Sequence, residues 1–478
     1  MNKDVNSVKP MDYFMKICEI PHKSADEGAL IDFLIDFAKE RNLSYEKDDI
    51  LNLIIRKPGS AGREKDEPLV FQAHVDMVYV ADKDAEHKYE EPLDLCIEGD
   101  KLSAKGTSLG ADDGIGVAMM LALLDEDRAD HPPYEMLFTT QEEDGLLGAL
   151  ELSDKWITGK TLINLDGEVE DDITCGCAGG FRGDITIKTE YTDTADNMQA
   201  VNLKVTGLKG GHSGLDIGLN RANANKVLGR ILDGLYKKYG ISICSISGGT
   251  KMNVIPSLAE AEICFDKALK AELIECVNGM ASAYYTEFKE AEPGLSVVCE
   301  DIACPPSAFD DKSTANVISA INLMPNGVLY RNEENGLIET SNNLGVIESV
   351  DGNVNLVCNP RSSISSHLLD IRKKLNDIGS ANNGDVNLTD GYPAWEYRKD
   401  SHLREIYVSE FTDYYGHEPN IEVIHAGLEC GIILEKYPEV DAVSVGPTIV
   451  KPHSTEETVG ISSIDRSWEL LQRVIDRL

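Results

Sequence analysis

The alternation of apolar and polar positions divides the first third of the chain into strands and helices. Short apolar runs predict four strands, at residues 51–56, 69–78, 135–140 and 161–165. Apolar residues at helical spacing predict helices at 24–42, 115–124 and 146–152. The first of these begins with Ser24 and Glu27 in the pattern of a capping box. Strands that alternate with helices predict a mostly parallel sheet with helices on both faces.

The middle of the chain has a different pattern of elements from the first third, because its strands alternate with long amphipathic helices. It predicts strands at 183–192, 199–208, 241–247, 259–265, 295–302, 337–349 and 353–359. The predicted helices lie at 222–238, 267–289, 313–324 and 366–377. These elements predict an α+β domain. The similar stretches 253–257 and 345–349 would divide it into two related halves, although chance similarity explains them equally well.

Strands and helices alternate again near the C-terminus, which indicates α/β structure. Helices are predicted at 402–415, 428–436 and 464–478, with strands at 421–424 and 442–445. A chain of 478 residues is too long for one ordinary core. We therefore expect an α/β domain of residues 1–185 plus 390–478, interrupted by an α+β domain of residues 186–389.

Side chains that can bind metal follow several predicted strands. In chain order they are His74 with Asp76, Glu142 with Glu143, and Asp166. In sheets of this kind, ligands bind beyond the carboxyl ends of the strands. Each residue alone has an ordinary explanation, such as a turn or a solvated helix start. Their joint occurrence at successive strand ends favours a metal site.

Two further features complete the candidate site. The glycine-rich turn 105–116 contains the adjacent carboxylates Asp112 and Asp113, and His453 follows the predicted strand 442–445. Zinc binds histidine nitrogen and carboxylate oxygen, and two zinc ions about 3.5–4 Å apart need a bridging carboxylate. These residues leave open which aspartate of the pair, and which of the two adjacent glutamates, binds metal. The other glutamate would accept a proton from the attacking water, and Asp76 would orient the neighbouring imidazole.

The overall charge and composition exclude several classes of partner. The formal net charge of −38 opposes binding to nucleic acid. No apolar run approaches the roughly 18 residues that span a bilayer, and residues 1–10 lack the apolar core of a signal peptide. Eleven cysteines without regular spacing indicate reduced thiols. We expect a cytoplasmic protein with no nucleic-acid or membrane partner.

At these residues the chain resembles the dinuclear zinc peptidases of the aminoacylase and carnosinase type. Within that group it resembles the bacterial aminoacyl-histidine dipeptidases, also called cytosolic non-specific dipeptidases. The motifs that carry the resemblance span essentially the whole chain: His74-Val-Asp76, Leu109-Gly-Ala-Asp-Asp-Gly-Ile-Gly116, Gln141-Glu-Glu143, Asn164-Leu-Asp166, Gly210-Gly-His-Ser-Gly214, His425-Ala-Gly-Leu-Glu-Cys-Gly431 and Pro452-His453. The resemblance implies a phosphorylase/hydrolase-like α/β catalytic domain interrupted by a lid domain.

The resemblance also implies a role for each residue of the site. Two Zn²⁺ would bind per chain, with Co²⁺ or Mn²⁺ as substitutes. The implied ligands are His74 and Asp166 for one ion, Glu143 and His453 for the other, and Asp112 as the bridge, followed by a cis peptide bond. Glu142 would be the general base, and Asp76 would orient His74.

The implied lid would supply contacts to the substrate. His212 would reach the oxyanion of the tetrahedral intermediate. Asn253 and Arg361 would hold the substrate's C-terminal carboxylate, a task that suits a planar guanidinium. Glu429 would contact the free amine. A turn histidine and a solvated arginine are the structural alternatives for His212 and Arg361.

The reaction that the resemblance implies is hydrolysis of unblocked dipeptides, aminoacyl-histidine dipeptides among them. An N-acyl amino acid amidohydrolase is a second enzymatic interpretation, and a non-catalytic zinc-binding protein is a third. An acidic contact at the amine favours the dipeptidase, and an unliganded base such as Glu142 has no use in a structural site. Small dipeptides would be the partners. The lid would either replace a partner subunit's lid or form a homodimer.

Overall fold

The chain divides into two compact units in the computed structural model, which describes residues 9–85, 87–332 and 336–478. The first unit comprises the described residues of Met1–Gly176 together with Tyr397–Ile424 and Leu428–Leu478. The second comprises the described residues of Cys177–Glu396 together with His425–Gly427. Both ends of the described chain therefore belong to the first unit.

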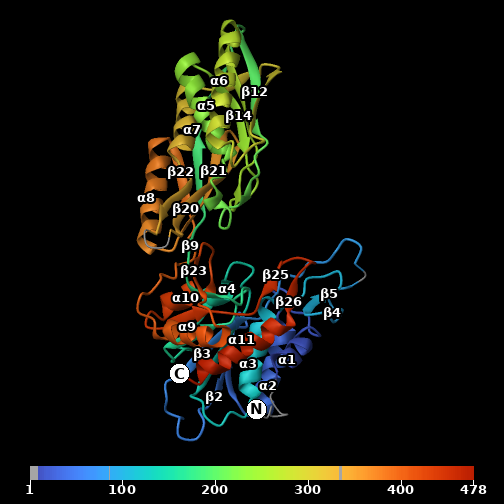
Figure 1. Ribbon diagram of the computed structural model, residues 1–478. Coiled ribbons are helices and arrows are strands. Elements are labelled where there is room, and N and C mark those ends of the chain that lie inside the picture. The colour runs from blue at the N-terminus through green and yellow to red at the C-terminus, as the bar shows by residue number, and fades with distance from the viewer. Residues whose placement is uncertain (1–8, 86, 333–335) are drawn as a thin grey trace. The chain divides into compact units, whose positions relative to one another are not determined.

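A mixed sheet forms the centre of the first unit (Figure 1). In spatial order, its strands within the described ranges are β1 (Ser44–Lys47), β2 (Leu53–Lys57), β6 (Tyr134–Thr139), β3 (Leu69–His74), β7 (Thr161–Asn164), β24 (Asp441–Ser444), β8 (Asp172–Cys177) and β23 (Asn420–Ile424). The four central strands, β6, β3, β7 and β24, are parallel. Antiparallel pairs flank them on either side. The predicted parallel sheet is therefore the centre of a wider mixed sheet.

Helices cover this sheet on both faces. They are α1 (Pro10–Ile17), α2 (Gly28–Glu40), α3 (Ala111–Asp125), α4 (Leu147–Glu151), α9 (His402–Tyr415), α10 (Glu429–Lys436) and α11 (Ile461–Ile475). On β3, Phe71 and Ala73 face the core that contains α3, whereas Gln72 points to the other face and contacts Glu429 at the start of α10. A smaller sheet is formed by β25 (Ile449–Val450), β26 (Thr458–Gly460), β5 (Lys101–Ala104) and β4 (Leu95–Glu98).

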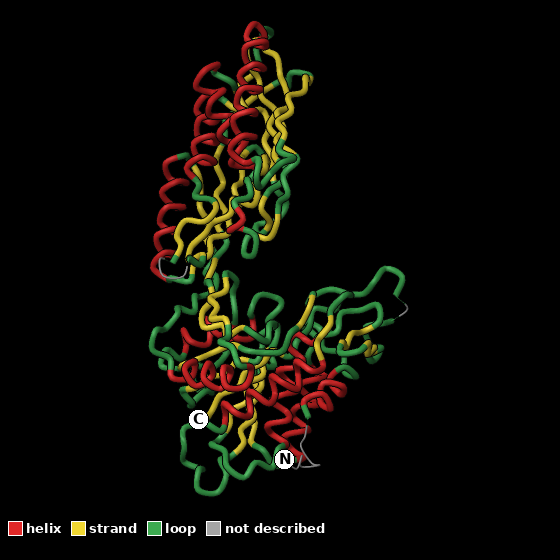
Figure 2. The backbone as a smooth tube through the Cα atoms, viewed as in Figure 1, coloured by secondary structure: helices red, strands yellow, loops and turns green. Residues whose placement is uncertain are grey.

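The second unit contains an antiparallel sheet with a layer of helices along one face (Figure 2). Its main path, in the described part of the chain, is β17 (Ser296–Ile302), β12 (Met198–Thr206), β16 (Ala259–Asp266), β14 (Ser242–Gly248), β20 (Ile338–Val350), β21 (Asn353–Ser362), β10 (Gly183–Lys188) and β22 (Gly384–Leu388). β19 (Gly327–Arg331) pairs with β20, and β9 (Gly179–Gly180) pairs with β21. The helices are α5 (Ala224–Tyr239), α6 (Lys270–Phe288), α7 (Asp311–Leu323) and α8 (Ser365–Ala381).

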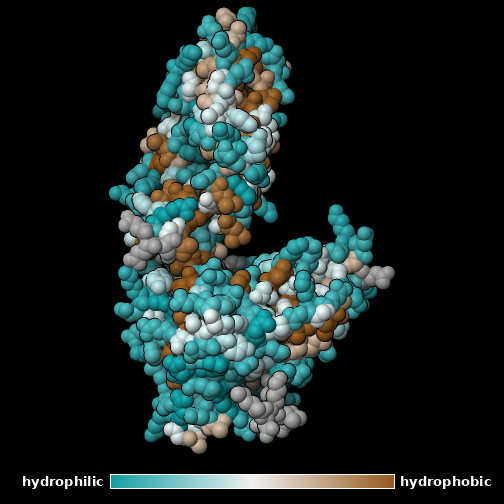
Figure 3. Space-filling model, viewed as in Figure 1, coloured by the Kyte–Doolittle hydropathy of each residue, from teal (hydrophilic) through white to brown (hydrophobic). Residues whose placement is uncertain are grey.

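Short elements complete the second unit. β11 (Tyr191–Asp193) pairs with β18 (Ser307–Phe309), and β13 (Gly211–His212) pairs with β15 (Val254–Ile255). Two 3-10 turns are η1 (Ile217–Leu219) and η2 (Lys267–Leu269). The largest apolar cores lie one in each unit. The surface drawn in Figure 3 is mostly hydrophilic. None of the helices in the described ranges has the length and apolar character needed to cross a membrane.

The first predicted helix differs from the structure at its beginning. It is α2, which starts at Gly28, and the predicted capping box does not form. Ser24 Oγ instead donates a hydrogen bond of 2.8 Å to Asp76 Oδ2. The Glu27 carboxylate accepts one of 3.1 Å from the backbone N–H of Gln141. Both side chains serve contacts between distant segments, which a local pattern does not reveal.

Candidate metal centre

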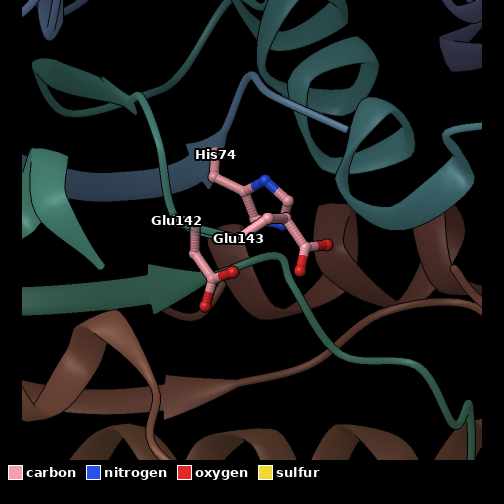
Figure 4. Close-up of side chains that lie close together, drawn as sticks. All are labelled: His74, Glu142 and Glu143. Carbon is pink, nitrogen blue, oxygen red and sulfur yellow. The ribbon is translucent and has the colours of Figure 1, made fainter. Parts of the chain in front are cut away.

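The sequence-predicted ligands converge at one edge of the sheet in the first unit. His74 ends β3, Glu142 and Glu143 follow β6, and Asp166 follows β7. These three strands are parallel neighbours, so their carboxyl ends meet. Figure 4 shows His74 at the end of its strand and both glutamates on the loop beyond the adjacent strand, with the three side chains pointing into the same space. His453 enters from the loop after β25.

The two carboxylate oxygens of Asp112 face different histidines. Oδ1 lies 3.1 Å from Nε2 of His74, and Oδ2 lies 3.0 Å from Nε2 of His453. The cis peptide bond that the resemblance implied is present between Asp112 and Asp113, in the first turn of α3. A carboxylate with one oxygen toward each of two histidines has the arrangement of a bridge between two cations.

Further carboxylates complete a group of ligand atoms around each histidine. Asp166 Oδ1 lies 3.4 Å from His74 Nε2, and Glu143 Oε1 lies 2.5 Å from His453 Nε2. Ligand atoms within 4.8 Å of one another form three groups: His74, Asp113 and Asp166; Asp112, Glu143 and His453; and His74, Glu142 and Glu143. The residues alone had left Asp113 open as an alternative to Asp112, and the resemblance had favoured Asp112. One oxygen of Asp113 accepts a hydrogen bond from Gly116 N–H, whereas the other is buried with no hydrogen-bond partner among the described residues.

This cluster contains more buried negative charge than its histidines can balance. Burial raises the pKa of Glu142, Asp113 and Asp166 above the ordinary carboxylate range. Burial by itself would lower the pKa of His74, but nearby carboxylates, first among them Asp166, raise it well above its usual value. The carboxylates of Asp112 and Glu143, both close to its Nε2, raise the pKa of His453 to about 11.

The donor set fits a pair of divalent metal ions. Buried carboxylates without positive partners are costly, and bound cations remove that cost. Imidazole nitrogen and carboxylate oxygen are ligands that zinc accepts. One oxygen of Glu143 is buried and has no hydrogen-bond partner within the described ranges, although it lies close to the His453 ring. The Glu143 oxygen and His453 Nε2 therefore face each other in the way that two ligands of one ion would.

Asp76 links the ends of two strands in the site. Its backbone carbonyl lies 2.9 Å from Nδ1 of His74, whereas its carboxylate is 3.5 Å from that nitrogen. The shorter contact to the ring therefore comes from the backbone, and the prediction had assigned it to the side chain. The carboxylate accepts hydrogen bonds from the backbone N–H groups of Glu142 and Glu143, at 3.0 and 3.2 Å. Asp76 thus anchors the loop that carries both glutamates.

Glu457, which sequence analysis missed, holds the turn before Asp112. Its carboxylate accepts hydrogen bonds from the three successive backbone N–H groups of residues 109–111, at 2.7, 3.0 and 2.8 Å. The residue is only 2% exposed and lies four positions after His453. One short segment therefore carries a candidate ligand and supports the candidate bridge. A second acidic residue after Pro452-His453 was the only sequence signal for it.

Glu429 lies buried next to the same cluster. Its Oε2 accepts hydrogen bonds from Gln72 Nε2 and Thr139 Oγ1, each at 2.6 Å. Its Oε1 has no hydrogen-bond partner in the described part of the chain, and burial raises its pKa to about 7. No role in the site had been predicted for Gln72 or Thr139. Polar residues within the buried strands β3 and β6 were the signal that could have identified them.

His212 and Asn253, two predicted lid residues, are neighbours within the second unit. His212 pairs with Val254 where β13 meets β15, next to Asn253. The backbone N–H groups of Gly214 and Leu215 both lie 3.3 Å from His212 Nδ1 and donate to it. Because Nδ1 is an acceptor, the ring proton lies on Nε2. Burial and the nearby Arg361 lower the pKa of His212, which keeps the ring neutral.

Arg361, the remaining predicted lid residue, is buried on β21. It donates hydrogen bonds to Asn359 Oδ1 at 3.2 Å and to the backbone carbonyl of His425 at 3.5 Å. Among the described residues, no carboxylate lies within ion-pair distance of its guanidinium. His425 Nε2 lies 2.7 Å from Ser341 Oγ, and burial followed by Arg361 lowers the pKa of His425 to about 4. No role had been predicted for His425 or Ser341.

The fold and this cluster correspond to a known class of enzymes. The family model described as "Peptidase family M20/M25/M40" matches residues 70–477, so the chain belongs to this family and is a peptide-bond hydrolase. The predicted family, the α/β fold class with its inserted lid and the assignment as an enzyme are thereby confirmed.

Individual relatives agree with this assignment. The chain is 36% identical over 473 residues to the cytosol non-specific dipeptidase of Escherichia coli (strain K12), covering 98% of this chain and 97% of the relative. It matches the crystal structure of an aminoacylhistidine dipeptidase from Vibrio alginolyticus with a TM-score of 0.93 and 36% identity, over 98% of this chain and 96% of the other. Aminopeptidase PepT from Bacillus cereus shares the fold, with a TM-score of 0.57 and 15% identity over 98% of each chain.

Proposed function

We propose that this chain is a metallo-dipeptidase that hydrolyses unblocked dipeptides, aminoacyl-histidine dipeptides among them, with two bound zinc ions. The observation that carries the proposal is the placement of Asp112, with one oxygen toward His74 and the other toward His453. The printed names of the relatives from E. coli and V. alginolyticus support the substrate class.

The short contacts suggest how the metal ligands are shared. His74 and Asp166 would hold one ion, Glu143 and His453 the other, and Asp112 both. Bound divalent cations would supply Lewis-acid activation of water and of the scissile carbonyl. Zn²⁺ fits this donor set, and Co²⁺ or Mn²⁺ would be substitutes because they accept the same ligand types.

Glu142 would act as the general base. It would accept a proton from the attacking water and then donate it to the leaving amine. Two observations support this role: it lies in the ligand cluster with His74 and Glu143, and it takes no part in the contacts of Asp112 with the histidines. Burial raises its pKa, which brings its proton affinity closer to that of a base working near neutral pH.

Charged side chains would recognise the two ends of a dipeptide. The free oxygen of Glu429 would contact the substrate's amine. The buried Arg361, with no acidic partner in the described ranges, would bind its carboxylate together with Asn253. The Nε2 proton of His212 would stabilise the oxyanion. Recognition of both charged ends restricts the substrate to two residues.

We also propose a cytoplasmic location. The cysteines, which are free thiols, and the name of the E. coli relative, a cytosol enzyme, support it.

A panel of end-blocked substrates tests the proposed function. We expect the zinc-loaded protein to hydrolyse a free aminoacyl-histidine dipeptide well and its N-acetyl and C-terminal amide forms poorly. Chelation should abolish hydrolysis, and zinc should restore it. Glu429→Gln should reduce the difference in hydrolysis rate between the free and the N-acetylated dipeptide. Faster hydrolysis of N-acyl amino acids would instead establish an amidohydrolase, and no hydrolysis by fully loaded protein would establish a non-catalytic metal-binding protein.

A further inference from the structure

Three cysteine sulfurs form a row in the second unit, in residues that the proposed function does not use. The Sγ of Cys264 lies 3.0 Å from the Sγ of Cys244 and 3.6 Å from the Sγ of Cys304. Cys264 is the middle member, and all three residues are thiols. The three residues are 20 and 40 positions apart, so the fold brings them together.

The strand pairing explains why these thiols meet. Cys264 on β16 is flanked by Ile263 and Phe265, which point into the main core, so its own side chain lies on the opposite face of the sheet. The pairing of β14 with β16 shifts register between Ile243 and Ser245. The residue at that irregularity is Cys244, whose sulfur is thereby placed against Cys264.

Cys304 reaches the same place from the far side of a neighbouring strand. Cys264 pairs with Ala200 on β12, and Ala200 pairs with Ile302 at the end of β17. Ala200 is fully buried and small, so the chain after Ile302 can cross above it. Thr194 holds this crossing segment, because it donates hydrogen bonds to the carbonyls of Pro305 and Pro306. These hydrogen bonds fix the residues directly after Cys304 and so hold Cys304 in position.

Accessibility differs along the row. Cys304 is exposed, Cys244 is half-buried and Cys264 is fully buried. The contact with Cys244 and burial raise the pKa of Cys264. Partial desolvation and the contact with Cys264 raise the pKa of Cys304, so exchange at these thiols becomes faster as pH rises. An oxidant arriving from solvent meets Cys304 first and Cys264 only afterwards.

We propose that Cys304, Cys264 and Cys244 form a thiol–disulfide exchange site, with glutathione disulfide or a similar small disulfide as the oxidant. The Cys304 thiolate attacks one sulfur of the oxidant, whose S–S bond breaks, and one glutathione leaves as a thiolate that takes up a proton. Cys264 loses its proton to solvent and attacks the Cys304 sulfur, which releases the second glutathione. Two protein thiols become one disulfide, and one glutathione disulfide becomes two glutathione thiols.

The third thiol allows the bond to move inward. Attack of the Cys244 thiolate on the Cys264 sulfur forms a Cys244–Cys264 disulfide and returns Cys304 to its thiolate. Disulfides in reducing compartments are usually transient and redox-sensing. This site lies wholly within the second unit and does not depend on the proposed dipeptidase reaction.

Thiol counting and peptide mapping test the proposal on the full-length protein. The zinc-loaded chain is incubated with glutathione disulfide at pH 8 and freed of excess reagent. One portion is titrated for thiols in denaturant, and a second portion is alkylated and digested for mass spectrometry. We expect a loss of two thiols per chain and a disulfide that joins Cys264 to Cys304 or to Cys244. A reductant should restore both thiols. A wild-type protein that retains glutathione on Cys304 without any link to Cys264 would overturn the proposal.

Variants separate the members of the row. Cys264→Ser should stop at one glutathione adduct on Cys304. Cys304→Ser, a change on an exposed loop, should abolish formation of any disulfide that contains Cys264 over the same time. Cys299→Ser on β17 is the matched control, because Cys299 packs against the main core, and it should behave as wild type. Formation of the Cys244–Cys264 disulfide at the wild-type rate in Cys304→Ser would also overturn the proposal, even if Cys264→Ser failed to fold.

Discussion

The carboxylate of Glu457 accepts a hydrogen bond of 2.8 Å from the backbone N–H of Ala111, the residue immediately before Asp112. The same carboxylate also binds the two preceding N–H groups. The amide of Glu457→Gln has one acceptor oxygen, so at least one of the three N–H groups would lose its partner. We expect its affinity for zinc to fall about 10- to 100-fold, as measured by competition with a chromogenic chelator.

The neighbouring residue provides the control for this experiment. Glu456 is exposed, and its carboxylate pairs with Lys451 at 2.6 Å. Glu456→Gln should therefore bind zinc as the wild type does. If Glu457→Gln bound zinc equally well, the turn before Asp112 would not depend on Glu457.

Replacement of Glu142 should separate metal binding from chemistry. We expect Glu142→Gln to keep both metal ions and to lose about 10²- to 10⁴-fold in kcat, because the water would lack its proton acceptor. Metal analysis and steady-state kinetics measure the two effects. Asp144→Asn, an exposed position on the same loop, should leave both unchanged. A kcat near that of the wild type would remove Glu142 as the general base.

The metal-free protein should lose stability as pH rises. Burial raises the pKa of Asp166 from 3.8 to about 8, so between these values the folded chain keeps a proton that the unfolded chain has released. Asp112 and Glu143 raise the pKa of His453 from 6.5 to about 11, so its stabilisation is complete below 6.5 and is lost as pH rises toward 11. Both groups bind protons more strongly in the folded state, and stability therefore falls with increasing pH.

Calorimetry checks this expectation. The melting temperature of chelator-treated protein should decrease steadily from pH 6 to pH 9. The zinc-loaded protein should change less, because metal binding displaces the protons from its ligands. A melting temperature of the metal-free form that stayed constant or increased over this range would contradict the unbalanced acidic cluster.

Arg361 should determine the preference for a free C-terminal carboxylate. A hydrogen bond to a charged group contributes about 1.5–3 kcal/mol, so we expect Arg361→Ala to raise KM for a free dipeptide about 10- to 100-fold. KM for the matching dipeptide amide should change little. Arg230→Ala, which removes an exposed partner of Glu287, is the control and should affect neither substrate. An equal increase for both substrates would show that Arg361 does not bind the carboxylate.

The regular elements of this fold were predictable because their periodicity records which side is buried. The helix predicted at 402–415 is α9 (His402–Tyr415), and the strand predicted at 135–140 is β6 within a residue at either end. β1 was not predicted. All four of its residues are exposed, so its side chains show no alternation. β8 was also missed, because its Cys-Gly-Cys segment lacks the branched and aromatic residues that identify strands.

The residues of the candidate site were likewise predictable only in part. His74, Asp166 and the two glutamates were identifiable because ligand-type residues at the ends of parallel strands must lie near one another. The role of Glu457 could not be assigned from the sequence, because its partners are main-chain N–H groups more than 300 residues away. A main-chain partner leaves no recognisable residue type in the sequence. Contacts to backbone depend on the tertiary fold, which local patterns do not describe.

Asp76 holds the loop that carries Glu142 and Glu143, because its carboxylate accepts hydrogen bonds from the main-chain N–H groups of both residues. These contacts to Asp76 do not involve the side chains at positions 142 and 143. We expect other side chains at 142 and 143 to leave these two main-chain hydrogen bonds in place. These two positions offer a practical starting point for redesigning the metal preference, or the reaction itself, within the same scaffold.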